Sequence, residues 1–220
     1  TFVADSATLS PADDLDGGEG TDELKVALDA GATETPTSTS IENHFYRAIA
    51  NGANADLSAA SGVSQVWYDR GLEDLSVTGV DSQVTIGVRG GDGDNTDNYT
   101  VEVADSLAGA ADDSFDVVLD GSDIDTLQID DGNDDSVETF NVTVDGDSSL
   151  DVISSANGDG IQTVDVGGEG SLTVSENIDW DTDETATFDA SDLTGDLDVF
   201  ISNALGNGGF DTVNVRSEER

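Results

Sequence analysis

The sequence predicts an all-β protein whose short strands stack into a parallel β-helix or β-roll-like solenoid. Three observations support this prediction: the second half repeats about every 24 residues, each repeat alternates polar and apolar residues, and turns rich in Asp and Gly separate the alternating segments. A repeat of this length cannot bury its own apolar face. Neighbouring repeats must therefore stack to form a continuous core.

One set of tetrapeptides marks the repeat most clearly. Its members begin at Ser114, Thr139, Thr163, Thr187 and Thr212, at spacings of 25, 24, 24 and 25 residues. In each tetrapeptide the second and fourth residues are apolar, so both point to the same side of a strand. We therefore expect two inward-facing ladders, one formed by Phe140, Val164, Phe188 and Val213 and the other by Val142, Val166, Ala190 and Val215.

A second set of alternating tetrapeptides lies between the first, beginning at Thr126, Ser149, Ser171 and Asp196. We expect its members to align with one another, so that each coil holds two short strands joined by two turns. A β-sandwich remains the alternative, because the same segments could pair antiparallel through turns such as Asp145-Gly146-Asp147.

The period is less clear before residue 110, and this divides the chain into two parts. Residues 1–109 are expected to form an irregular N-terminal β segment, and residues 110–220 the solenoid of repeats of about 24 residues. Strand-like stretches cover 23–28, 63–68, 72–78, 84–88 and 98–103. Residues 33–40 are interpreted as a loop or linker. Residues 41–50 are open to either a helical or an extended interpretation.

The net charge makes anionic partners unfavourable and cations favourable. The chain has 49 acidic and six basic residues, a formal net charge of −43, and the acids comprise 37 Asp and 12 Glu. Asp favours turns and metal loops over helices. Because nucleic acids and anionic membranes are bound through Lys and Arg, neither is an expected partner. No apolar run is long enough to insert into a membrane. Such self-repulsion predicts that cations belong to the folded state.

Two nonapeptides match a calcium-binding turn of the form G-G-x-G-x-D-x-U-x. Residues 17–25 match at every specified position, and residues 206–214 match with Asn at the second Gly. In such turns the glycines allow backbone carbonyls to reach an ion and the Asp supplies a carboxylate. Ca²⁺ suits them because it accepts six to eight oxygen ligands in a tolerant geometry. The candidate ligands are Gly18, Gly20 and Asp22 in the first turn and Gly208 and Asp211 in the second. For each nonapeptide, a glycine-rich turn that binds no ion remains the alternative.

Three further acidic turns are candidate Ca²⁺ sites. Each places carboxylates one to three residues apart, as metal loops do, without fitting one template. Their candidate ligands are Asp92, Asp94 and Asp97; Asp131 and Asp134; and Asp179, Asp181 and Asp183. Solvated turns without an ion are the alternative.

The sequence contains few of the residues that enzymes commonly use for catalysis. His44 is the sole histidine and Cys is absent, so the usual pairs of nucleophile and base are missing. The six basic residues are scattered in the sequence, and we do not expect them to form a groove for an acidic polysaccharide. The chain is therefore predicted not to be an enzyme.

The chain resembles bacterial surface-layer (S-layer) proteins with RTX-type calcium-binding repeats. LSPADDLDGGEGTDELKV, at residues 9–26, is similar to their calcium-binding segments, and FDASDLTGDLDVFIS, at 188–202, is similar to a phrase of their strand repeats. The resemblance implies calcium-dependent folding, type I secretion to the cell surface, and assembly into a lattice. By motif position it implies Ca²⁺ ligation at Asp22 and Asp211.

These observations predict a structural, calcium-binding, self-assembling protein of a surface layer or extracellular scaffold. Its expected partners are further copies of itself, in a lattice or filament, and cell-surface polysaccharide. The alternative is a calcium-dependent adhesin module that binds a surface or glycan. A halophile's acidic domain without specific ions is a third hypothesis.

Overall fold

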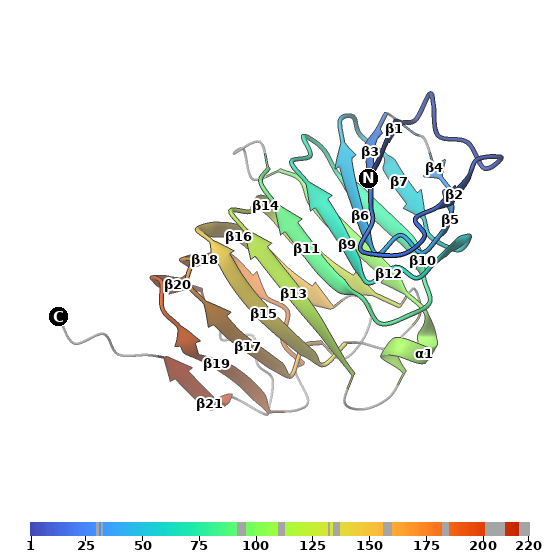
Figure 1. Cartoon of the computed structure of the whole chain (residues 1–220). Helices are drawn as coiled ribbons and strands as arrows, with labels where there is room; N and C mark the ends of the chain where they lie inside the picture. The colour runs from blue at the N-terminus through green and yellow to red at the C-terminus, as the bar shows by residue number, and fades with distance from the viewer. Residues whose placement is uncertain are drawn as a thin grey trace.

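The protein is a β-solenoid of parallel strands (Figure 1). The structure is a computed structural model, which describes residues 1–29, 31, 33–91, 96–109, 113–131, 133, 137–155, 160–181, 185–200 and, for the backbone alone, 210–215. Every strand pairing among these residues is parallel, and strands that follow one another in the chain enter different sheets. The predicted solenoid is therefore confirmed and the β-sandwich is wrong.

Three parallel sheets form the walls of the solenoid. The first sheet, in spatial order, contains β1 (Phe2–Asp5), β3 (Glu23–Leu28), β6 (Asn43–Ala48), β9 (Gln65–Asp69), β11 (Thr85–Arg89), β13 (Ser114–Asp120), β15 (Thr139–Gly146), β17 (Thr163–Gly168), β19 (Ala186–Leu193) and β21 (Phe210–Val215). The second contains β20 (Leu197–Val199), β18 (Leu172–Ile178), β16 (Ser148–Ser155), β14 (Asp123–Asp130), β12 (Asn98–Val103), β10 (Leu75–Val80), β7 (Ala53–Asp56) and β4 (Thr33–Glu34). The third, smaller sheet contains β2 (Asp14–Asp16), β5 (Thr37–Thr39) and β8 (Ala60–Ser61).

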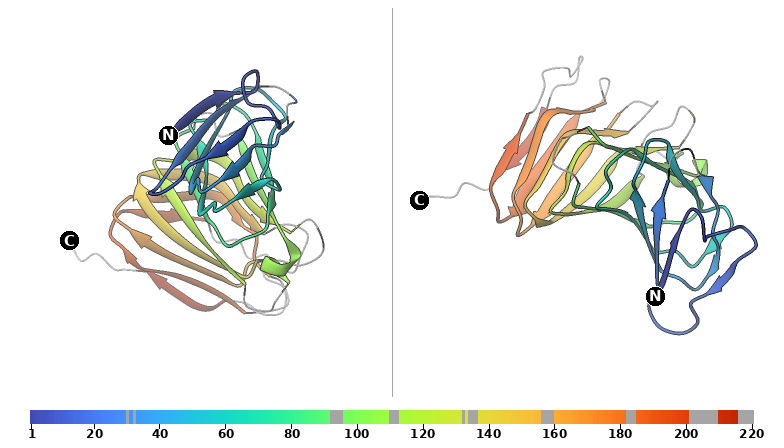
Figure 2. Two further views of the ribbon diagram at one scale, coloured as in Figure 1. Left: turned by 45° about the vertical axis from the view of Figure 1, so that its right-hand side comes forward. Right: turned by 90° about the horizontal axis from the view of Figure 1, so that it is seen from above.

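The first predicted ladder of the first sheet is confirmed, and the second is confirmed in part. Phe140, Val164 and Phe188 lie beside one another in register and are buried, and the backbone of Val213 continues the row. In the second ladder Val142 pairs with Val166 and Ala190 with Val215, while a bulge lies between Val166 and Ala190. Phe115 extends the first ladder by one coil toward the N-terminus. Figure 2 shows these coils stacked one on another along the axis.

The predicted alignment of the second set is wrong in part. Leu172 pairs with Leu197 as expected, but Leu127 lies beside Ile153 and not beside Leu150. β14 and β16 keep one register throughout, in which Ile124 pairs with Leu150 and Leu127 with Ile153, so this coil spans 26 residues where the tetrapeptides are spaced by 23. Alternation sets the face of a residue within a strand, and it cannot set the length of the coil that separates two strands.

The N-terminal coils differ in length, and this explains why the sequence shows no clear period there. Leu24, His44, Val66 and Ile86 lie side by side, so these coils advance by 20, 22 and 20 residues. Ile86 pairs with Val117, so the next coil spans 31 residues and includes α1 (Asp105–Ala108). The sheets continue across the expected boundary, because β11 pairs with β13 and β12 with β14. The division after residue 109 stays a prediction.

Two N-terminal segments are now assigned. Residues 41–50 contain the strand β6 and not a helix, and residues 33–40, interpreted as a loop, contain the short strands β4 and β5. In the part of the chain that the structure describes, no helix has the length and apolar character needed to cross a membrane.

Stacked glycines form one edge of the C-terminal coils, where the chain passes from the first sheet to the second. Gly121, Gly146, Gly170 and Gly195 follow one another at spacings of 25, 24 and 25 residues. A Cβ on Gly170 would lie 2.5 Å from the carbonyl oxygen of Gly146, and one on Gly195 would lie 2.1 Å from that of Gly170. Only glycine therefore lets the backbones of successive coils approach this closely.

Candidate cation sites and the outer faces of the solenoid

The first nonapeptide forms the turn between β2 and β3. Gly18 and Gly20 have φ of 79° and 115°, values that favour glycine, and Gly17 lies against the carbonyl of Ser40 on the next coil. The backbone N–H of Asp22 donates a hydrogen bond of 2.8 Å to the Glu42 carboxylate. Glu42 belongs to the next coil, so the turn brings together two acids from successive coils. The sequence prediction missed Glu42, although it follows Asp22 by 20 residues, which is one N-terminal coil.

The second nonapeptide lies far from the first. Gly208 lies outside the described residues, and Asp211 lies in β21, of which only the backbone is described. Strands β3 and β21 are near opposite ends of the first sheet. The two nonapeptides therefore cannot complete each other's coordination shell.

Asp97 accepts a hydrogen bond inside the protein. Its side chain is buried, and its Oδ2 accepts a hydrogen bond of 2.8 Å from the Tyr68 hydroxyl. Asp92 and Asp94, predicted to act with it, lie outside the described residues.

Asp131 has an incompletely satisfied carboxylate. It continues the inward alternation of Leu127 and Ile129, and it is only 4% exposed. Its Oδ1 accepts a hydrogen bond of 2.8 Å from the N–H of Asn133, whereas its buried Oδ2 has no hydrogen-bond partner among the described residues. Asp134 lies outside them. A buried carboxylate oxygen without a partner is costly, so this position favours a cation.

A pocket of about 250 Å³ adjoins Asp131. Asp81, Glu102 and Asp105 also line it, and these acids come from successive coils. The sequence prediction did not connect them with Asp131. Within the described ranges, no three side chains of Asp, Glu or His lie close enough together to hold a metal ion. Backbone carbonyls or water would have to supply further ligands.

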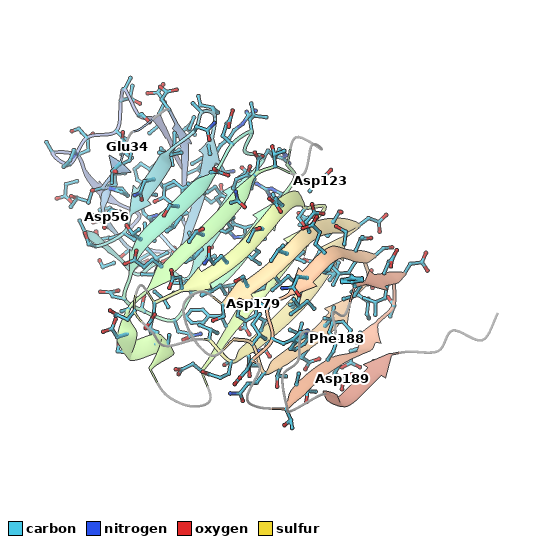
Figure 3. All side chains as sticks on the ribbon, turned by 180° about the vertical axis from the view of Figure 1, so that it is seen from behind. Glu34, Asp56, Asp123, Asp179, Phe188 and Asp189 are labelled. Carbon is cyan, nitrogen blue, oxygen red and sulfur yellow. The ribbon has the colours of Figure 1, made fainter. Side chains whose placement is uncertain are left out.

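Asp179 and Asp181 flank the buried Trp180 at the end of β18. The Asp179 carboxylate accepts a hydrogen bond of 3.2 Å from the Ser154 hydroxyl, and Asp181 is buried. Asp183 lies outside the described residues. Figure 3 shows acidic side chains along the whole solenoid, from Glu34 and Asp56 near its N-terminal end to Asp179 and Asp189 near the other.

The outer surface of β13 to β19 is an acidic face. It carries Asp116, Asp145, Asp165, Asp189 and Asp192, and these strands contain no Lys or Arg. Asp165 lies directly beside Asp189 on the next strand. Burial, together with the charges of Asp189 and Asp192, raises the pKa of Asp165. On the other side, Asn141 separates the acids and donates a hydrogen bond of 3.0 Å to Asp116.

The outer surface of the N-terminal strands carries a basic patch, which we define as Lys25, Arg47, Arg70 and Arg89 around the rings of Phe45 and Trp67. Phe45 and Trp67 stack with centroids 5.8 Å apart, and Trp67 lies over Gly87. Lys25 and Arg89 each lie 5.2 Å from the centroid of Phe45. These four residues, scattered in the sequence, therefore lie together in the fold, where Glu23 pairs with Lys25 and Asp69 with both Arg70 and Arg89. The four are separated by about one coil in the sequence, so stacking gathers them on one face.

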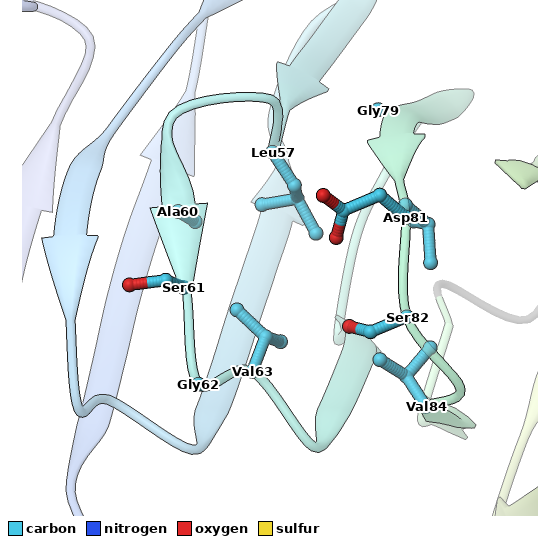
Figure 4. Close-up of a pocket in the computed structure, with 10 residues that line it drawn as sticks. Leu57, Ala60, Ser61, Gly62, Val63, Gly79, Asp81, Ser82 and Val84 are labelled. Atoms are coloured by element: carbon cyan, nitrogen blue, oxygen red, sulfur yellow. The ribbon is translucent and has the colours of Figure 1, made fainter. Parts of the chain in front are cut away.

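His44 and a pocket beside β8 lie apart from the acidic turns. His44 is buried in the core, where its Nδ1 and the Tyr46 hydroxyl form a hydrogen bond of 3.0 Å. Burial lowers the pKa of His44 to about 4. A pocket of about 200 Å³ lies where the third sheet ends at β8, between Leu57, Val63 and Val84 with Asp81 and Ser82 beside them (Figure 4).

Comparisons with known proteins do not assign the chain to a family. No protein-family model matches the chain, and neither a curated protein nor a solved structure shows significant similarity to it.

Proposed function

We propose that this chain is a structural, self-assembling component of a surface layer or extracellular scaffold, and that Ca²⁺ bound between its coils stabilises the fold. Asp165 carries the proposal: it lies in register beside Asp189, and its pKa is raised. Neighbouring parallel strands are about 4.8 Å apart. Like charges directly opposite each other at this distance are destabilising unless a cation or a proton neutralises them.

The surroundings of Asp131 favour Ca²⁺ as the cation. The unpartnered Oδ2 of Asp131 and the other carboxylates of its pocket are hard oxygen donors, which Ca²⁺ prefers. The Glu42 carboxylate, which accepts a hydrogen bond from the Asp22 N–H of the preceding coil, is a further oxygen donor beside the glycine turn. Each cation would stabilise the fold by joining two neighbouring coils.

The architecture supports a structural role. A solenoid is held by contacts between neighbouring coils, so it presents long, regular outer surfaces. Its sole histidine lies in the core and cannot reach a substrate in solution. The rows of outward side chains, one per coil, suit repeated contacts with other copies.

Circular dichroism and electron microscopy test the proposal. The protein is refolded in chelator, in chelator with concentrated NaCl, and in millimolar CaCl₂. We expect a clearly higher Tm in CaCl₂ than in chelator, and assemblies only with CaCl₂. MgCl₂ at equal ionic strength is the control for charge screening.

Three results would contradict the proposal. A metal-free protein that folds as cooperatively and melts as high as the calcium-loaded one would remove the role of Ca²⁺. Recovery of the fold by NaCl alone would favour an acidic domain adapted to salt. Calcium-loaded protein that stays monomeric at high concentration would remove the self-assembling role.

A further inference from the structure

Gln65, Trp67 and Asp69 form a line of outward side chains on β9, in the middle of the basic patch, and we call this line the β9 platform. All three are half-buried, and they alternate with the buried Val66 and Tyr68. Because a parallel strand rises about 3.3 Å per residue, the Cα atoms of Gln65 and Asp69 each lie about 6.6 Å from that of Trp67. The Trp67 ring is therefore flanked along the strand by two polar side chains.

The neighbouring strands hold the Trp67 ring in place. A Cβ on Gly87 would lie 2.2 to 2.5 Å from three atoms of the ring, so the ring lies across the backbone of β11, where only glycine leaves room for it. The ring stacks on Phe45 with centroids 5.8 Å apart, and its Nε1 donates a hydrogen bond of 2.9 Å to Gln65. Because one side of this half-buried ring packs on the sheet, its other side is left to the solvent.

Each end of the β9 platform has an unused hydrogen-bonding group. Arg89 and Arg70 both contact Oδ1 of Asp69, at 3.0 and 3.4 Å, and no described residue donates a hydrogen bond to Oδ2. At the other end, the Gln65 Oε1 accepts the Trp67 hydrogen bond, and its Nε2 has no acceptor among the described residues. One end therefore offers an acceptor and the other a donor, on either side of an apolar ring.

The charges around the β9 platform favour an uncharged partner. Lys25 is paired with Glu23, and Arg70 and Arg89 share Asp69, so these three cations are already compensated in part. The net charge of −43 also repels polyanions from the molecule as a whole. A partner that binds here must therefore use an apolar face and hydrogen bonds rather than charge.

We propose that the β9 platform binds a neutral glycan, with one pyranose unit on Trp67 and its hydroxyls at Asp69 and Gln65. A pyranose with equatorial hydroxyls has apolar C–H faces and a polar rim, so it matches an aromatic ring with hydrogen-bonding groups at both ends. A hydroxyl both donates and accepts, so it can satisfy the free Asp69 oxygen and the Gln65 N–H groups. The proposed scaffold does not require such a site, and this inference goes beyond it.

Titration with cellohexaose and with chitohexaose tests the site. Binding to the full chain in millimolar CaCl₂ is measured by calorimetry, and we expect at least one of the two glycans to bind saturably. Trp67→Ala should weaken binding at least about tenfold, and Gln65→Leu, which keeps bulk beside the ring but removes the amide, about three- to tenfold. Phe200→Ala removes an aromatic ring that is 55% exposed, directly after β20, and should bind like the wild type. Circular dichroism verifies that each variant is folded.

Tryptophan fluorescence locates the binding site. Trp180 is only 6% exposed, whereas Trp67 would be covered by the sugar. Glycan binding should therefore change the fluorescence of the wild type and not that of Trp67→Phe. An equal change in both proteins would place the glycan elsewhere and overturn the proposal.

The other failures are also distinct. No saturable binding of either glycan would overturn the proposal, as would wild-type affinity in Gln65→Leu and in folded Trp67→Ala. Binding of polygalacturonate alone, lost in Gln65→Leu, would overturn the neutral partner and identify an acidic glycan. Each of these results leaves the proposed scaffold standing, because assembly is measured separately by electron microscopy.

Discussion

His44 makes the stability of the core sensitive to acid. Its pKa is about 4 in the folded protein against an ordinary 6.5, so the unfolded chain binds the proton first as the pH falls. The stability that the neutral ring provides is therefore complete above pH 6.5 and lost progressively down to pH 4. The shift corresponds to about 3 kcal/mol.

The variant His44→Leu tests this sensitivity, because Leu24 occupies the neighbouring position of the same row. Urea denaturation between pH 7 and pH 4 should show a smaller loss of unfolding free energy for the variant, by up to about 3 kcal/mol. Its stability at pH 7 reports separately the cost of leaving the Tyr46 hydroxyl without its partner. Identical pH slopes for the two proteins would contradict the prediction.

Asp165 is expected to oppose folding when its charge is not compensated. Because its folded pKa is raised, protonation stabilises the folded state as the pH falls toward that pKa, and the charged form is destabilising above it. Asp165→Asn should therefore raise the Tm in chelator, with a gain below about 1 kcal/mol since the side chain is largely exposed. The gain should shrink in CaCl₂. Asp198→Asn is the control, and an equal gain there would point to net charge alone.

At the scale of an element, the glycine edge allows successive coils to stack closely. Gly170→Ala should lower the free energy of unfolding by about 1–3 kcal/mol, because the new methyl group would collide with the backbone of Gly146. Gly167→Ala is the matched control: it lies in the neighbouring strand β17, and its Cβ would meet Asp192 at 3.5 Å, an ordinary contact. Thermal unfolding of both variants measures the difference. Equal Tm values would mean that the edge adjusts without cost.

At the scale of the whole molecule, stability depends on the contacts between neighbouring coils and on the charges that face one another across them. Each coil contacts only the next, so the solenoid is strengthened wherever two coils are joined and weakened wherever their charges repel. Salt screens exposed charges separated by more than about 10 Å at 0.1 M, but adjacent carboxylates such as those of Asp165 and Asp189 lie well within that distance. Screening at 0.1 M is therefore expected to compensate this pair less completely than a cation bound between the coils would.

Much of the C-terminal half could be predicted from the sequence. Thr139, Thr163 and Thr187 recur at equal spacings, and the apolar residues beside them alternate strictly, so the register of the first sheet follows from the repeat. In the N-terminal half the coils differ in length, and no single period aligns Leu24, His44 and Val66. In the second sheet, the 26-residue step from Leu127 to Ile153 and the register shift between β16 and β18 have the same effect.

The sequence by itself determined the stacked parallel strands, their inward ladders and the acidic turns, because a period of about 24 residues with strict alternation can bury its apolar side only by stacking. Only the tertiary structure decided which distant residues meet. Lys25, Arg47, Arg70 and Arg89 form one patch, Asp22 meets Glu42, and one oxygen of Asp131 lacks a partner among the described residues. These results depend on the length of each coil, since a difference of one residue moves a side chain to the opposite face of its strand.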